Sequence, residues 1–232
     1  MTAAGGTISV LVGAVLLRLT ITDTYERYVR VGMGRWLLVA GVAVIMLGLA
    51  TVVQALRRVQ PVDAHDHGHD HGHGGIGVGW LLLAPIAALL LVAPPTLGSY
   101  GVSRGATVDV RAGAPVFRRI PRSAAPHGMT LLEFSQRAYD HDGFSFNRVP
   151  VRLTGFVAAA EDGGFRLARY TIACCAADAT PVVVRVRGTS GDPPPLDQWV
   201  TVTGTFLRGG DELPELRVTS VAEIHPPDDP YE

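Results

Sequence analysis

The sequence predicts a membrane α-helical N-terminal part followed by an all-β C-terminal domain, a five-stranded OB-like barrel preceded by one short helix. Two observations predict this division. The 232-residue chain has 47% hydrophobic and only 18% charged residues, and its long apolar runs all fall within residues 1–96, which is unlike a single soluble globule. Short alternating runs separated by turn residues fill the C-terminal part. We expect a transmembrane region over 1–96, an extended connector over 97–129 and the β domain over 130–232.

Three apolar runs are predicted to be transmembrane helices, which makes the protein a multi-pass protein of the cell membrane in contact with lipid. The run over 36–56 carries no charge and begins with Trp36, and about 20 apolar residues cross a bilayer core. The run over 76–95 is also uncharged. The run over 5–21 is interrupted by Arg18. A signal peptide is the alternative for this first run, but a basic start and a small-residue cleavage site are both missing.

A histidine-rich loop is expected over residues 60–75, where "HDHGHDHGH" places a histidine at every second position. Neutral imidazole binds Zn²⁺, Cu²⁺ and Ni²⁺. Because no neighbouring groups orient the rings, such a site holds its ion weakly and exchanges it. The only cofactor expected is therefore a loosely held Zn²⁺, and the alternative is a soluble spacer without metal. The candidate ligands in this loop are His65, His67, His69, His71 and His73.

Five runs in the C-terminal part alternate as β-strands do. Gly155 and Gly204 occupy matching places in "VRLTGFV" and "VTVTGTF", and a glycine within a strand indicates a bulge or sharp coil of the kind that a small barrel needs. An open five-stranded sandwich is the alternative. A short helix is predicted to begin after Thr130, with Glu133 at capping-box spacing. The five runs are "VPVRLTGFVA", "FRLARYTIA", "PVVVRVRG", "QWVTVTGTFLRG" and "ELRVTSVAEIH".

Nucleic acid is not an expected partner. The net charge is −1 and the arginines are spread thinly, whereas phosphate recognition requires a concentrated basic surface. The aromatic residues of the strands lie at positions that suit a core better than a stacking surface. No phosphate-binding loop, nucleophile elbow or triad spacing is present, so the sequence does not predict an enzyme. The aromatic residues concerned are Phe156, Phe165, Tyr170, Trp199 and Phe206.

The stretch "IACCAADATP" contains both cysteines of the chain, Cys174 and Cys175, with Asp178 nearby. Two thiols and a carboxylate can bind a soft or borderline metal ion, and thiols can also exchange disulfides. Both sulfurs reach one ion only if the backbone bends, because neighbouring side chains of a regular strand point to opposite faces. The alternative is that both thiols are small buried apolar groups. His127, His141 and His225 could complete a metal site.

The chain resembles the YcgQ-like permease subunits of bacteria over nearly its whole length. The resemblance rests on the His-rich loop, the apolar end "LLLVAPPTLGSYG", the core segments "VRLTGFV", "RYTIACCAADATPV" and "WVTVTGTF", and the closing "HPPDDPYE". It implies that the protein acts beside a separate multi-helix permease. The residues carried over from it are Cys174, Cys175 and Asp178, with no role assigned.

Together these observations predict an accessory subunit of a membrane permease that captures a divalent metal ion, hands it over, or gates the permease in response to it. The rival interpretation is a membrane-anchored thiol-redox or envelope-maintenance protein in which Cys174 and Cys175 cycle and the histidine tract is a spacer.

Overall fold

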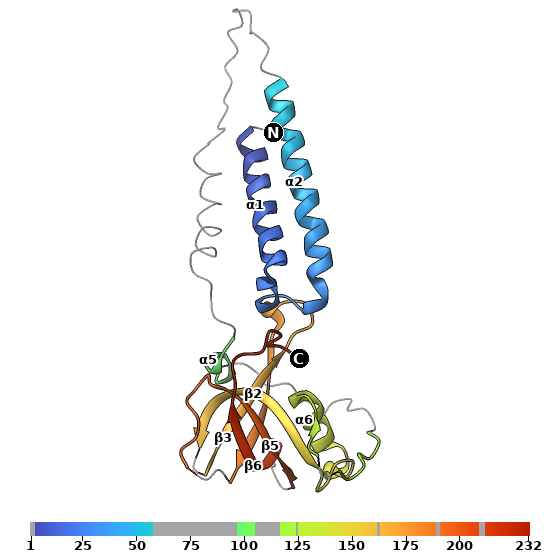
Figure 1. Ribbon diagram of the computed structural model, residues 1–232, viewed down its shortest axis with the longest axis vertical. Coiled ribbons are helices and arrows are strands. Elements are labelled where there is room, and N and C mark those ends of the chain that lie inside the picture. Colours follow the sequence, from blue (N-terminus) through green and yellow to red (C-terminus); the bar gives the residue numbers. More distant parts are fainter. Residues whose placement is uncertain are drawn as a thin grey trace, which may run out of the picture. The chain divides into compact units, whose positions relative to one another are not determined.

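The computed structural model divides the chain into two compact units, Met1–Tyr25 with Val31–Pro94 and Glu26–Arg30 with Pro95–Glu232. We call them the helical unit and the β unit. Figure 1 shows both, coloured along the sequence. The residues that the structure describes are 3–57, 97–104, 117–123, 125–161, 163–188, 191–208 and 212–232.

The helical unit contains two packed α-helices, α1 (Ala3–Ile21) and α2 (Gly34–Arg57), which run side by side in Figure 1. Two short 3₁₀ helices lie between them in the chain, η1 (Thr24–Arg27) and η2 (Val31–Met33). The buried residues of α2 are all glycines, spaced seven apart: Gly34, Gly41 and Gly48.

Glycine lets the two helix backbones approach closely. A Cβ atom on Gly48 would lie 2.8 Å from the Gly6 carbonyl oxygen and 2.9 Å from the Val10 nitrogen. One on Gly13 would lie 2.8 Å from the Gly41 carbonyl oxygen. Small residues that bring backbones together in this way are typical of helix pairs in membranes, where van der Waals packing replaces the hydrophobic effect.

The expected helix over 36–56 is confirmed as α2. Counted with η2, Val31–Arg57 is the one described segment that is long and apolar enough to cross a membrane, whereas Gly5–Ile21 is apolar but shorter. The prediction of three transmembrane helices is therefore not supported, because one segment of the described residues meets the combined requirement of length and hydropathy. The expected helix over 76–95 and the histidine loop over 60–75 lie outside the described residues.

The β unit is a mixed six-stranded sheet with short helices beside it. All five predicted strand runs are confirmed, and the sixth strand, β1, has only two residues. The expected connector over 97–129 contains a helical turn, α5, as well as β1. The elements are α5 (Ser99–Val102), β1 (His127–Gly128), α6 (Leu131–Tyr139), η3 (His141–Gly143), β2 (Pro150–Glu161), β3 (Gly164–Thr171), η4 (Ala176–Asp178), β4 (Thr180–Arg187), β5 (Trp199–Leu207) and β6 (Glu215–Glu223).

The strand order is β1-β2-β3-β4-β6-β5, with a further pairing of β2 to β5. Each of the five longer strands therefore pairs with two others among β2 to β6. The pairing of β2 with β5 runs from Pro150 opposite Thr205 to Phe156 opposite Trp199. The pairing of β4 with β6 is parallel and short, from Arg185 opposite Glu215 to Arg187 opposite Arg217. The β2–β5 ladder thus joins two strands that lie apart in the linear order of the sheet.

Alternate residues of the strands feed two apolar clusters on opposite faces of the sheet. On β4, Val182 and Val184 belong to the larger cluster, whereas Val183 belongs to the smaller one. The larger cluster also takes in Phe134 and Leu131 of α6. Of the strand aromatics predicted to be buried, Phe206 is half-buried and the others are confirmed: Phe156, Phe165, Tyr170 and Trp199.

Gly155 and Gly204 both lie where a neighbouring strand comes close. A Cβ on Gly155 would be 2.6 Å from the Ala168 carbonyl oxygen, and one on Gly204 would collide with the Arg217 carbonyl oxygen. The β5–β6 register shifts between Thr203 and Gly204, and the residue without a partner is Thr219 on β6, opposite the glycine. At Gly155 the glycine permits close strand approach instead.

The helix α6 begins as predicted. The Thr130 side chain accepts a hydrogen bond from the Glu133 N–H at 3.0 Å. Two further N–H groups of the first turn bond to a residue far along the chain. The Glu232 carboxylate accepts from Leu131 N–H at 2.8 Å and from Leu132 N–H at 2.9 Å. Burial raises the pKa of Glu232, and these two donors oppose that rise. The segment ending at Glu232 thus helps to hold α6 against the sheet.

Candidate metal centre

The two cysteines lie on the turn that joins β3 to β4, which we call the cysteine turn (residues 173–178). Ile172, the residue before it, is buried in the smaller apolar cluster, which anchors the turn to the sheet. The backbone bends at Ala173 and Cys174 and then forms the 3₁₀ helix η4. This bend removes the strand geometry that would have sent the two thiols to opposite faces.

Asp178 holds the turn together by accepting four hydrogen bonds. Its Oδ1 accepts from the Ala173 N–H at 2.8 Å. Its Oδ2 accepts from the Cys174 N–H at 2.9 Å, the Cys175 N–H at 3.3 Å and the Cys174 thiol at 2.9 Å. A carboxylate that receives several backbone N–H groups organises a tight turn, because it satisfies donors that regular secondary structure leaves unpaired. The position of Asp178 three residues after Cys175 is therefore explained by the turn itself.

The sulfur atoms of Cys174 and Cys175 are 3.7 Å apart. Both cysteines are free; Cys174 is exposed and Cys175 is half-buried. The two sulfurs and a carboxylate oxygen of Asp178 all lie within 4.8 Å of one another. The interpretation of both thiols as buried apolar groups is wrong, because the bend places Cys174 at the surface.

The hydrogen bond between Cys174 and Asp178 shifts both groups. It is the largest cause that raises the pKa of Cys174 to about 11, with the contact to Cys175 next. The same bond, with the N–H groups of Cys174 and Ala173, lowers the pKa of Asp178 to about 2. At neutral pH the turn therefore holds a thiol proton shared with a carboxylate.

The structure brings together three of the predicted ligands, and the histidines that could have completed the site lie elsewhere. Within the described part of the chain, the group of side chains able to hold an ion consists of Cys174, Cys175 and Asp178. His127, His141 and His225 are exposed and do not belong to it. The ligands expected in the histidine tract lie outside the described residues: His65, His67, His69, His71 and His73.

One contact of the cysteine turn has no counterpart in the sequence analysis. Tyr28 and Arg30, far away in the chain but within the same compact unit, form backbone hydrogen bonds with residues on either side of Cys175. Main-chain atoms are the same in every residue, so no pattern of side chains signals this pairing.

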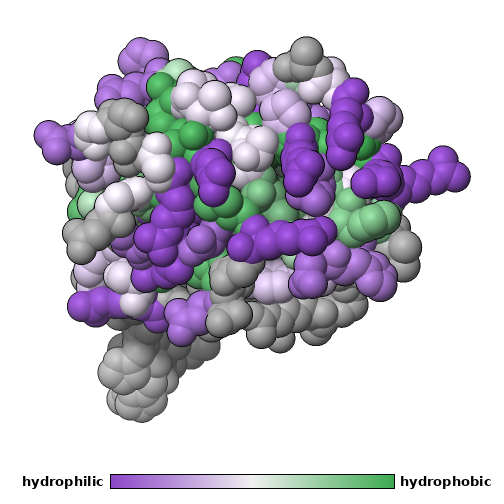
Figure 2. Space-filling view, turned by 90° about the horizontal axis from the view of Figure 1, so that it is seen from below, coloured by the Kyte–Doolittle hydropathy of each residue, from purple (hydrophilic) through white to green (hydrophobic). Residues whose placement is uncertain are grey.

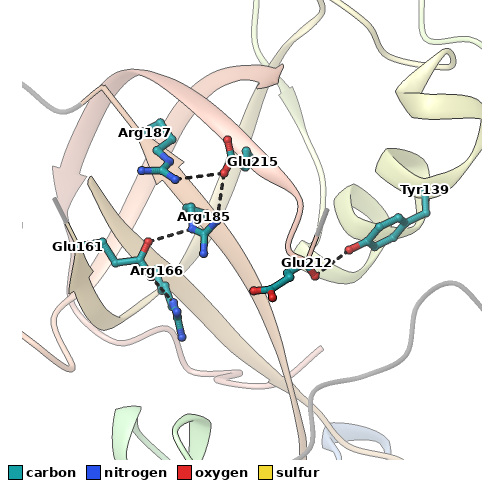
Figure 3. Close-up of polar contacts among 7 residues, drawn as sticks. All are labelled: Tyr139, Glu161, Arg166, Arg185, Arg187, Glu212 and Glu215. Atoms are coloured by element: carbon teal, nitrogen blue, oxygen red, sulfur yellow. Dashed lines mark hydrogen bonds and ion pairs between the residues drawn. The ribbon is translucent and has the colours of Figure 1, made fainter. Parts of the chain in front are cut away.

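A second polar cluster links four strands of the sheet. Arg185 on β4 donates to Glu161 at 2.9 Å and to Glu215 at 3.2 Å. Arg166 also pairs with Glu161, and Arg187 with Glu215 at 3.4 Å. Figure 3 shows these side chains arranged as a chain across β2, β3, β4 and β6. Because each carboxylate is shared by two arginines, the cluster joins the four strands.

The fold and the turn define a mixed-sheet domain that carries a thiol–carboxylate site at one strand connection. Residues 132–232 match a family model described as the DUF1980 C-terminal domain. This part of the chain is therefore similar to the DUF1980 C-terminal domain, which fits the resemblance to the YcgQ-like proteins. The match does not extend to the histidine loop or to a role beside a permease, and both stay predictions. No curated protein matches the chain.

Proposed function

We propose that this protein is a membrane-anchored accessory subunit of a permease and that its cysteine turn captures a divalent metal ion, Zn²⁺ being the best fit. The single observation that carries the proposal is the geometry of the two sulfurs. Two thiolates bound at about 2.3 Å to one tetrahedral Zn²⁺ lie about 3.8 Å apart, and the sulfurs of Cys174 and Cys175 are 3.7 Å apart. The separation of the two sulfurs therefore suits a shared ion.

The third ligand is Asp178. Its Oδ2 lies 2.9 Å from the Cys174 sulfur, a distance set by the proton between them. With the proton gone and an ion bound, tetrahedral geometry places a sulfur and a carboxylate oxygen about 3.5 Å apart. A small rotation of the carboxylate supplies the difference. Release of thiol protons to solvent makes binding stronger as the pH rises.

Three protein ligands leave one position of a tetrahedral ion open. Open sites exchange their ion or accept an incoming ligand, whereas structural zinc sites are closed by four protein ligands. We therefore propose a transfer site, loaded from the histidine tract over 65–73, which collects ions weakly, and unloaded to the permease. The proposal of a permease as the partner rests on the resemblance to the YcgQ-like subunits.

The architecture proposed around this site is an OB-like barrel on a multi-pass membrane part. The barrel is supported by the pairing order, because β2 to β6 pair in the sequence β2-β3-β4-β6-β5 and back to β2, with β4 and β6 parallel. The multi-pass part is supported by α2, by the glycine packing of α1 on α2, and by the uncharged run over 76–95.

The rival thiol-redox function is disfavoured by the same turn. A redox-active cysteine needs a lowered pKa, so that its thiolate is populated near neutral pH. The Asp178 carboxylate does the opposite and raises the pKa of Cys174 to about 11. The groups that shift the pKa of this thiol include no cationic side chain.

Zn²⁺ titration of the detergent-purified full chain tests the proposal. Three variants are compared with the parent: the five tract histidines changed to serine, Cys174→Ala with Cys175→Ala, and both sets combined. We expect one tight ion to survive in the serine variant and to disappear when the cysteines are removed as well. Equal Zn²⁺ binding with and without the cysteines would contradict the proposal.

A further inference from the structure

The cysteine turn is paired with a backbone segment from the N-terminal part of the chain. We call this segment, Glu26–Arg30, the strap; in the chain it connects α1 to α2, and it belongs to the same compact unit as the turn. Val29 forms an antiparallel bridge with Cys175. The Arg30 N–H donates to the Cys174 carbonyl oxygen at 3.2 Å, and the Ala176 N–H donates to the Tyr28 carbonyl oxygen at 2.7 Å. The strap therefore grips the peptide groups on both sides of Cys175.

A second attachment holds the start of the strap. The Tyr231 hydroxyl donates to the Arg27 carbonyl oxygen at 2.6 Å. Tyr231 is itself buried against the sheet and forms a parallel bridge with Tyr170 at the end of β3. This anchor does not involve the cysteines. The pairing at Tyr28 and Arg30 is thus the part of the strap that depends on the conformation of the cysteine turn.

We propose that occupancy of the metal site controls how firmly the strap, a segment that lies between α1 and α2 in the chain, is held against the cysteine turn. The inference rests on the proposed function, because it requires an ion on Cys174, Cys175 and Asp178. Ligation joins the side chains of residues 174, 175 and 178 to one centre and restrains the peptide groups between them. Those peptide groups are the ones that pair with the strap.

The coupling works in both directions. If the ion favours the paired strap, the paired strap strengthens binding of the ion by the same factor, because the two equilibria are linked. The Asp178 carboxylate gives the link a direct route: it accepts the Cys174 and Cys175 N–H groups and also supplies a metal ligand. Only thiol protons leave, and they go to solvent.

Arg30 offers a matched pair of variants. Arg30→Pro removes the N–H that donates to the Cys174 carbonyl oxygen, whereas Arg30→Ala keeps that N–H and changes only the side chain. Both are made in the full chain, in detergent, with the five tract histidines changed to serine so that Zn²⁺ reports on the cysteine turn. We expect Arg30→Pro to weaken Zn²⁺ binding by roughly five- to a hundredfold and Arg30→Ala to stay within about twofold of the parent.

Amide hydrogen exchange provides a readout that requires no substitution in the strap. Zn²⁺ is expected to slow exchange at the Arg30 and Ala176 amides of the parent, because both are donors of the strap pairing. Unchanged exchange at these amides on saturation with Zn²⁺, or equal affinity in Arg30→Pro and Arg30→Ala, would overturn the coupling while leaving the metal site in place. Absence of Zn²⁺ binding by the serine-substituted parent would overturn the proposed function and the coupling with it.

Discussion

The two compact units of this protein are packed in opposite ways. In the β unit the large apolar side chains are inside: Phe134, Phe146 and Phe165 have no exposed surface. In the helical unit the buried residues of α2 are glycines, and large side chains are outside, with Trp36 and Leu47 each 69% exposed. Figure 2, a view onto the lower end of the molecule in Figure 1, shows mostly hydrophilic side chains with hydrophobic atoms between them.

The contrast corresponds to the two ways in which proteins pack in water and in lipid. Water drives large apolar groups into the interior of the β unit. Lipid provides no such drive, so helices in a membrane pack through small residues and leave large apolar side chains facing the acyl chains. The arrangement of α2 follows the second rule.

The largest loss of stability is expected from Phe134→Ala in the β unit. Phe134 contacts Phe146 edge-on, with ring centroids 5.3 Å apart, and Phe206 at 6.0 Å. Truncation leaves a cavity at the centre of the larger apolar cluster and should lower the free energy of unfolding by about 3–5 kcal/mol. Urea unfolding of the full chain in detergent measures this. A loss below about 1 kcal/mol would show that α6 is not part of the core.

A smaller effect is expected from Gly48→Leu in the helical unit. Its Cβ would lie 2.8 Å from the Gly6 carbonyl oxygen, so the helices must separate, at a cost of about 1–3 kcal/mol. Faster amide exchange along α1 and α2 is the expected signal. The control is Leu47→Ala, which removes an exposed side chain beside the same contact. Equal amide exchange in both variants would contradict the claim that α1 and α2 pack through their glycines.

Much of the β unit could be predicted from the sequence, because its strands alternate and its turns are marked by glycine and proline. The Thr130 cap also has a local signal, and Gly204 marks the place on β5 where the β5–β6 register shifts. The glycines of α2 at positions 34, 41 and 48 have a seven-residue spacing that is visible in the sequence and indicates a helix-packing face.

The candidate site could be predicted only in part. The residue types of Cys174, Cys175 and Asp178 indicated a metal ligand set, but the bend at Ala173 and Cys174 that brings the sulfurs together arises from hydrogen bonds to Asp178. The contact with the strap was not predictable. It joins Val29 to Cys175 across most of the chain and uses backbone atoms alone.

Asp178→Asn should change the reactivity of the exposed thiol with little effect on the core. Without the carboxylate that raises the pKa of Cys174 to about 11, the pKa should fall towards its ordinary value. A fall of one unit increases the thiolate fraction at pH 8 about tenfold. The rate of alkylation as a function of pH measures the shift, with Glu161→Gln as a control distant from the turn. An unchanged profile would show that Asp178 does not hold the thiol proton.

The smallest effect is expected from lowering the pH, which acts on the hydrogen bonds of the cysteine turn. The pKa of Asp178 is lowered to about 2, so its hydrogen bonds stabilise the folded turn fully above its ordinary pKa near 4, and that contribution is lost as the pH falls through about 2. Amide chemical shifts of Ala173 and Cys174 in NMR spectra should titrate with a midpoint near 2. A midpoint near 4 would mean that the carboxylate is not engaged by these N–H groups.

X-ray absorption at the zinc edge tests the central claim most directly. The sample is the Zn²⁺-loaded full chain with the five tract histidines changed to serine, which leaves the cysteine turn as the proposed site. We predict two sulfur ligands at about 2.3 Å together with oxygen or nitrogen ligands at about 2.0–2.2 Å. A spectrum with only oxygen and nitrogen ligands would contradict the account, because the paired sulfurs of Cys174 and Cys175 would then play no part in holding the ion.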